Sequence, residues 1–194
     1  MARDRTGDNR FGLVRQRLDI KPLLTAFPPQ VLWRGFRYRL SERIQDGSPF
    51  SFHTVEELAN TFQTSTTATA IRLVEYGSFP SMVLCSNVRG RTWFTRSDIV
   101  PRTVWPHESL GRDTVAFGLH RSAAIMPPGP TVVNAAQWIN HPRSNNYTIC
   151  EDSVRITPNL VLTLLWWKDE RQVLDLTDEE DDESEGQTRY DDFG

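Results

Sequence analysis

Apolar residues recur at the three- and four-residue spacing of a helix in two stretches of residues 54–77. The positions that would share the buried faces are Val55, Leu58, Ala59, Phe62, Ala68, Ile71 and Val74. Between them, Gln63 and Thr64 make a tight turn, and Ser65 or Thr66 can cap the helix that follows. The pattern therefore predicts two short helices joined by about three residues.

The first helix is predicted to begin at a capping box, Thr54-Val55-Glu56-Glu57. In such a box a threonine hydroxyl accepts a hydrogen bond from the first helical amides, and a glutamate three positions later reaches back to the cap. We therefore expect Thr54 to be the N-cap.

The outer face of the second helix is expected to present four polar side chains, Thr66, Thr67, Thr69 and Arg72. The pair of short helices at residues 54–77 is interpreted as a helix-turn-helix unit, in which such side chains of the second helix can contact phosphates or base edges. Helical hairpins of this shape are also common packing units, and the turn lacks a glycine. A structural role therefore stays open beside the binding role.

After residue 77 the hydrophobic period becomes that of strands. The predicted strands are residues 79–88, 91–99, 115–120, 147–156 and 159–168, and residues 131–139 fit either a strand or a short helix. The first two strands are joined by a turn that contains Gly90, and the last two by Thr157-Pro158-Asn159. This order predicts an α+β fold with an antiparallel sheet of about five strands.

Composition separates a folded middle from two polar ends. The chain is 38% apolar with six Trp and ten Phe, which is too apolar for a disordered protein. We expect residues 1–22 to be a disordered basic arm, 23–77 a helical part, 78–174 an α+β sheet domain and 175–194 a disordered acidic tail. Residues 175–194 hold ten acidic residues and one Arg, a net charge of −9, which leaves +6 on the first 174 residues. A basic body permits contact with nucleic acid or an acidic partner.

Two further features bear on the compartment. No run of eighteen apolar residues exists, and the Arg-rich start is not followed by the apolar stretch of a signal peptide. The lone Cys85 and Cys150 are expected to be buried, unpaired thiols. The sequence thus predicts a soluble, cytoplasmic protein without membrane contact.

Known catalytic patterns are missing from the sequence. Its histidines, His53, His107, His120 and His141, are far apart and expected at the surface or in loops, and there is no HExxH pair to hold zinc. Gly-x-Ser-x-Gly and phosphate-binding loops do not occur either. The adjacent Glu151 and Asp152 would face opposite sides of a strand, so we do not expect them to share an acid–base site. No catalytic or metal residue is predicted.

Several motifs in order resemble the ImmA/IrrE family of metallo-endopeptidases. They are TVEELANTFQTSTTATAIRL at residues 54–73, then RTWFTRS, NAAQWI and CEDSVRITPNLVLTLLWW. The match covers about residues 20–168. The resemblance implies a helix-turn-helix unit followed by a GAF-like sensor domain. In that family a zinc peptidase domain with HExxH precedes these parts.

The peptidase domain has no counterpart here, because only some 22 residues precede the matched region. Zinc is therefore expected only if a peptidase domain lies upstream, and the chain is either a truncated product or a relative that kept its regulatory half. We expect a non-catalytic recognition module that binds a protein partner, such as a DNA-binding repressor, through Thr66, Thr67, Thr69 and Arg72. The alternatives are a DNA-binding transcriptional regulator and a zinc peptidase completed by missing sequence.

Overall fold

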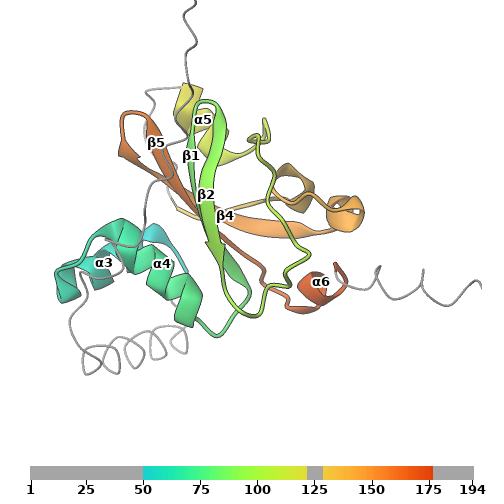
Figure 1. Cartoon of the computed structure of the whole chain (residues 1–194), viewed down its shortest axis with the longest axis horizontal. Coiled ribbons are helices and arrows are strands. Elements are labelled where there is room, and N and C mark those ends of the chain that lie inside the picture. Colours follow the sequence, from blue (N-terminus) through green and yellow to red (C-terminus); the bar gives the residue numbers. More distant parts are fainter. Residues whose placement is uncertain (1–49, 122–128, 177–194) are drawn as a thin grey trace, which may run out of the picture.

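The computed structural model describes residues 50–121 and 129–176, and these form an α+β fold around one antiparallel sheet (Figure 1). The strands are β1 (Ser81–Asn87), β2 (Gly90–Arg96), β3 (Thr131–Asn134), β4 (Thr148–Thr157) and β5 (Leu160–Trp166). Their order across the sheet is β2-β1-β5-β4-β3, and every pair is antiparallel. The predicted class and the predicted sheet of about five strands are confirmed.

Tight turns set the two long hairpins of this sheet. Gly90 has φ +131°, a conformation that side chains rarely adopt, and a Cβ at this position would lie 2.2 Å from the carbonyl oxygen of Glu108. The chain can therefore turn from β1 into β2 directly beneath the loop that contains Glu108. The two hairpins lie side by side because β1 also pairs with β5.

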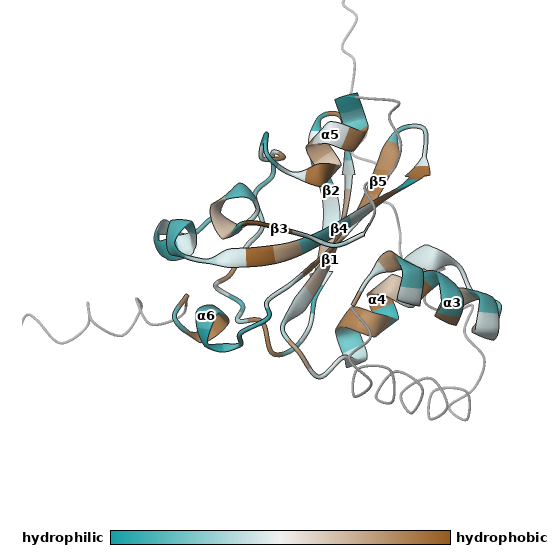
Figure 2. Cartoon of the chain, turned by 180° about the vertical axis from the view of Figure 1, so that it is seen from behind, coloured by the Kyte–Doolittle hydropathy of each residue, from teal (hydrophilic) through white to brown (hydrophobic). Residues whose placement is uncertain are grey.

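The helices lie on both faces of the sheet. One side carries α3 (Phe52–Phe62) and α4 (Thr66–Tyr76), and the other carries α5 (Val115–Arg121), α6 (Arg171–Leu174) and the 3₁₀ helices Ala135–Gln137 and Pro142–Asn146. Both sides are visible in the view from behind, coloured by hydropathy (Figure 2). Two short helices joined by three residues were predicted for α3 and α4, and this is what the structure shows.

Alternation along the central strands feeds two separate hydrophobic cores. On β5, Leu162 and Leu164 pack toward α3 and α4, whereas Val161 and Leu165 pack toward α5 and α6. Side chains of a strand point alternately to opposite faces, so an almost wholly apolar strand supplies both cores. The sheet is therefore the middle layer between two helical layers.

Residues 115–120 form a helix, so the prediction of a strand there is wrong. The run is short and apolar, and its pattern fits either element. Thr114 decides between them, since its side-chain oxygen accepts a hydrogen bond from Phe117 N at 3.1 Å and acts as the helix cap. Residues 131–139, which fitted either element, hold both: β3 and then a 3₁₀ turn.

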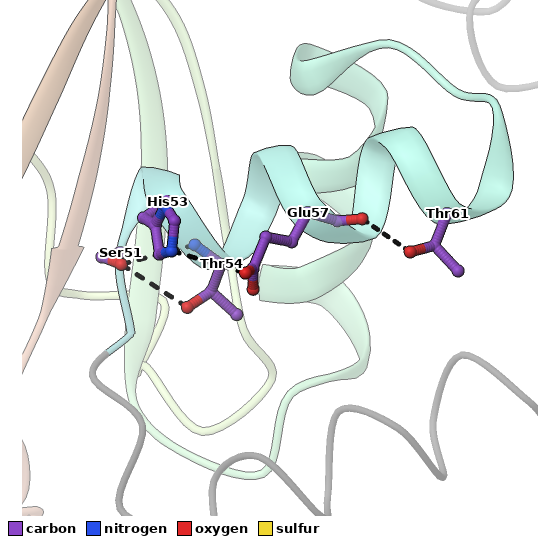
Figure 3. A network of polar contacts seen from close by, with 5 residues as sticks. All are labelled: Ser51, His53, Thr54, Glu57 and Thr61. Atoms are coloured by element: carbon purple, nitrogen blue, oxygen red, sulfur yellow. Dashed lines mark hydrogen bonds and ion pairs between the residues drawn. The ribbon is translucent and has the colours of Figure 1, made fainter.

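The predicted N-cap of α3 is also wrong by three residues. Ser51 is the N-cap, and its hydroxyl accepts from Thr54 N at 3.5 Å, so that Thr54 lies inside the helix (Figure 3). The side chain of Glu57 lies 3.4 Å from His53 Nε2, one turn earlier on the exposed side, while the backbone carbonyl of Glu57 accepts from Thr61 Oγ1 at 2.8 Å.

The register of the sheet keeps the two thiols apart. Cys85 and Val154 flank the same β5 residue, and Cys150 lies four positions from Val154 along β4. The thiols are thus separated by about 10 Å across the strands and about 13 Å along them, while a disulfide needs Cα atoms closer than about 7 Å. Both are buried and unpaired, as expected.

Some expectations fall on other parts of the chain. The basic arm at 1–22, the first part of the helical region and the acidic tail beyond Leu176 lie outside the described residues. Leu176 itself, which was assigned to the tail, is buried in the core beside α6.

Candidate recognition surface

The four residues expected on the outer face of α4 do not share one surface. Thr66 and Thr67 are partly exposed. Thr69 is only 1% exposed, and its hydroxyl lies 2.7 Å from that of Thr64, where it fixes the turn between α3 and α4. The expected outward position of Thr69 is therefore wrong.

Arg72 is engaged by its own helix. Its side chain is 15% exposed, and Nη1 donates to Glu75 Oε2 and to the Tyr76 hydroxyl, both at 3.2 Å. Its guanidinium also lies 5.6 Å from the centre of the Tyr76 ring. Burial raises the pKa of Glu75, and the charge of Arg72 offsets part of that rise. Arg72 thus supports α4 rather than standing out from it.

After the partly exposed Thr66 and Thr67, α4 has one turn without an open face. Four consecutive residues, Ala68, Thr69, Ala70 and Ile71, are buried. Consecutive helical residues are about 100° apart, so four of them cover the whole circumference of the helix. A recognition helix inserts such a turn into the major groove. The geometry of α4 therefore does not favour the alternative of reading DNA.

Glu151 is completely buried on the α5 side of the sheet. It accepts hydrogen bonds from Ala116 N at 2.9 Å, from Ser153 Oγ at 2.9 Å and from Trp138 Nε1 at 3.0 Å. Burial raises the pKa of Glu151, and these hydrogen bonds offset part of the rise. The carboxyl group joins α5, the 3₁₀ turn before Trp138 and β4.

Asp152 is a second buried carboxylate, and it binds the start of a helix on the opposite face of the sheet. Its Oδ2 accepts from Phe52 N, the first residue of α3, at 2.7 Å. Burial raises the pKa of Asp152, and this hydrogen bond acts against the rise. Glu151 and Asp152 thus hold one helix start each on opposite sides of β4, as strand geometry predicted, and they do not share a site.

His120 is the histidine that departs from the expected surface or loop position. It lies in α5, partly buried, with Nε2 3.0 Å from the hydroxyl of Ser86. Burial and the charge of Arg155 lower the pKa of His120. Arg155 in turn donates to the carbonyl oxygen of Leu119 at the end of α5. Because Ser86 is only 2% exposed, the serine and histidine fasten the helix to β1 and offer no accessible nucleophile.

Metal ligands do not gather in the part of the chain that the structure describes. Among residues 50–121 and 129–176, no three His, Cys, Asp or Glu side chains lie together as a metal ion would require. In the same residues, no helix combines the length and the apolar character needed to cross a membrane.

A cluster of arginine–aromatic contacts joins β2 to the loop that follows it. We call it the Trp105 surface; its members are Arg91, Phe94, Arg96, Arg102 and Trp105. The guanidinium of Arg91 lies 4.8 Å from the centre of the Phe94 ring, and that of Arg96 lies 5.4 Å from Phe94 and 4.8 Å from Trp105. The two rings meet edge to face, 5.4 Å apart. Arginines and aromatic rings therefore alternate along one surface.

Trp105 stands out although its neighbours are fixed. It is 50% exposed, while Val104 and Pro106 on either side are buried. Its carbonyl oxygen accepts from Asn140 N at 2.8 Å, and Pro106 forms a β-bridge with Ile139. The exposed ring is thus carried by a rigid backbone, which reduces the entropy that binding would cost.

The arginines hold the loop and also keep it positive. Arg96 Nη1 donates to the carbonyl oxygens of Pro101 and Val104, both at 2.8 Å. Burial, and then the charge of Arg102, lower the pKa of Arg96, so the two guanidinium groups are near each other. Residues 89–112 contain five Arg against one Asp and one Glu, a net charge of +3.

No site was predicted at these residues, which belong to the predicted strand 91–99 and to the stretch that follows it. The only signal in the sequence was the excess of arginine in residues 89–112, close to aromatic residues such as Phe94 and Trp105. Which rings and cations meet depends on how the loop folds back on β2, and periodicity does not show that.

No model of a known protein family matches this sequence, and no curated protein matches it. The resemblance to ImmA/IrrE proteins therefore depends on the sequence motifs alone, and the function must be argued from the geometry.

Proposed function

We propose that this chain is a non-catalytic recognition module that binds a protein partner through the Trp105 surface. The observation that carries the proposal is a half-exposed tryptophan on a rigid loop, with an arginine against its ring. Tryptophan and arginine are the residues that most often dominate the energy of protein interfaces. A ring exposed in this way gains free energy when a partner covers it.

The interior supports the same proposal from another direction. Glu151, Asp152 and the pair of Ser86 and His120 all contact helices of this chain. Those contacts give these four buried or partly buried residues a structural task and direct the search for function to the surface.

The resemblance stated above suggests which partner to try first. We propose a DNA-binding repressor, with α3 and α4 as the helix-turn-helix unit of an ImmA/IrrE-like regulator and the sheet as its GAF-like part. The cytoplasm is the proposed location, because two cysteines that the sheet holds apart are not the disulfide framework typical of exported domains. On this proposal Trp105 lies at the centre of the binding region, whereas Thr66 and Thr67 belong to α4, which packs on the opposite face of the sheet.

A comparative pull-down tests the proposal with the full chain as bait and quantitative mass spectrometry as readout. The informative variants are Trp105→Ala and Arg102→Glu, and the control is Val88→Ala, another exposed apolar residue, 74% exposed, in the β1–β2 turn. A repressor retained by the wild type and by the control, and reduced at least tenfold by both test variants, supports the proposal. Equal retention by all four proteins, or no retained repressor, contradicts it.

A further inference from the structure

The chain carries its own candidate ligand for the Trp105 surface. Residues 178–185, called here the acidic segment, hold seven carboxylates in eight positions and lie outside the described residues. The geometry points to this segment as an internal ligand that occupies the Trp105 surface when no partner is bound. The inference shares that surface with the proposed function and gives it a form of regulation, competition between the acidic segment and the partner.

The described chain ends in the core that also supports the loop of the Trp105 surface. Leu176 is buried in the same hydrophobic core as Val100 and Val104, which lie in the loop of the Trp105 surface. The hydroxyl of Tyr147 donates to Asp175 Oδ2 at 3.2 Å, and Arg143 donates to the carbonyl oxygen of Asp175 at 3.1 Å. The acidic segment therefore starts two residues after an anchored point.

The chain leaves β5 toward α6 at the same end of the sheet at which β2 ends in Arg96. Ser97, just after β2, donates its N–H to the carbonyl oxygen of Ser81 at the start of β1, and Trp167, just after β5, donates to that of Pro80. The strands β2 and β5 therefore end at the same end of the sheet (Figure 1). Arg96 lies at the end of β2, and the chain continues from the end of β5 into α6.

The acidic segment is long enough to reach the Trp105 surface from Leu176. Nine residues separate Leu176 from Glu185, and an extended chain covers about 3.4 Å per residue, so the acidic segment reaches up to about 30 Å from Leu176. Residues packed in one core with Leu176 lie well inside that radius. The Trp105 surface is accessible to the acidic segment without any change in the described fold.

The acidic segment and the region of the Trp105 surface carry opposite charges. The acidic segment contributes −7, against +3 for residues 89–112. Each exposed ion pair is weak, but a short tether supplies an effective concentration of the order of millimolar. Several weak pairs made within one chain can therefore occupy the surface and still yield to a partner that also covers the Trp105 ring.

Zero-length cross-linking of the full chain, without any partner, tests the contact. The chain has two lysines, Lys21 and Lys168, so an added lysine reports on its own surroundings above a small background. The test variant is Arg102→Lys, which keeps the charge, and the matched control is Arg89→Lys, also exposed but at the opposite end of β2. A carbodiimide then joins amine and carboxylate only where they touch, and mass spectrometry of the monomer band identifies the linked peptides.

The expected result is a cross-link from position 102 to residues 178–185 at least fivefold more abundant than from position 89. Its yield should fall severalfold in 0.5 M NaCl, because salt shortens the range of the attraction. Equal yields at the two positions, no link from position 102, or links confined to a dimer band would each overturn the inference. Since no partner is present, none of these outcomes depends on the pull-down.

Discussion

Replacing Glu151 with alanine is expected to lower the free energy of unfolding by about 3 kcal/mol. The substitution removes the acceptor for three donors. Ser153 keeps a partner, since its hydroxyl also lies 2.8 Å from that of Thr163. Ala116 N and Trp138 Nε1 lose the acceptor that Glu151 supplied, and each buried donor without an acceptor costs about 1–3 kcal/mol.

Two opposing effects set the size of the loss. The cavity left by the missing side chain adds to it, while removal of a buried carboxyl group, whose pKa burial has raised, reduces it. Urea unfolding followed by tryptophan fluorescence measures the difference. The control is Glu56→Ala on the exposed side of α3, for which we expect a change within about 0.5 kcal/mol. A loss below 1 kcal/mol for the Glu151 variant, or a loss equal to the control, would refute the reasoning.

The pH dependence of the same site provides a second arm. Because the pKa of Glu151 is raised in the folded state, this carboxyl group ionises at a lower pH in the unfolded chain than in the folded chain. The free energy of unfolding of the wild type therefore falls as the pH rises from the unfolded pKa to the folded pKa of this group. Below both values the burial penalty is absent. A Glu151→Gln variant does not titrate, so its deficit relative to the wild type should be larger at pH 4 than at pH 7. An equal deficit at both pH values would contradict the assigned direction.

Substitutions at three further positions follow from local geometry. Asp152→Ala should cost about 1–2 kcal/mol by leaving Phe52 N without its acceptor, whereas Asp152→Asn keeps an acceptor and should cost less; thermal unfolding distinguishes them. Gly90→Ala should cost about 1–3 kcal/mol, since its φ is positive and its Cβ would meet Glu108 O. Gly118→Ala, in α5 with nothing within 4 Å, should instead stabilise by about 0.5–1 kcal/mol. A neutral Gly90 variant or a destabilised Gly118 variant would speak against these assignments.

Elements whose pattern repeats over many residues could be predicted from the sequence. The helices α3 and α4 follow a helical period over two turns or more, and β4 and β5 are long and joined by turn residues. Short elements could not. The seven residues of α5 fit two structures, and the choice is made by Thr114 locally and by Glu151, which lies 35 positions from the amide it accepts.

Cap positions show a related limit. Ser51 and Thr54 are both good N-cap residues three positions apart, and a local rule does not rank them. The structure decides through Asp152, whose carboxylate accepts from Phe52 N and so fixes the helix start beside Ser51. A residue a hundred positions away in the sequence thus determines where α3 begins.

Thr69 shows why the expected binding face was misplaced. A threonine on a helix is polar by type, and sequence reasoning placed it toward solvent. In the structure its hydroxyl is satisfied by Thr64, which makes burial inexpensive. The same reasoning overlooked Trp105, which is apolar by type and was left in a loop. Residue type predicts burial only where no local partner changes the cost.

Polar pairing in the interior and exposure of Trp105 are two consequences of one arrangement. Adjacent carboxylates on β4 hold helices to both faces of the sheet, and the central strands β1 and β5 are covered on both faces by this chain, so they do not serve as a platform for a partner. Contact with another molecule then has to use an edge or a loop. At the β2 edge Arg96 binds two loop carbonyls and also supports the Trp105 ring, so the group that fixes the loop also presents the contact residue. An interface built in this way is set before binding, and competition by a charged segment is a simple means of controlling it.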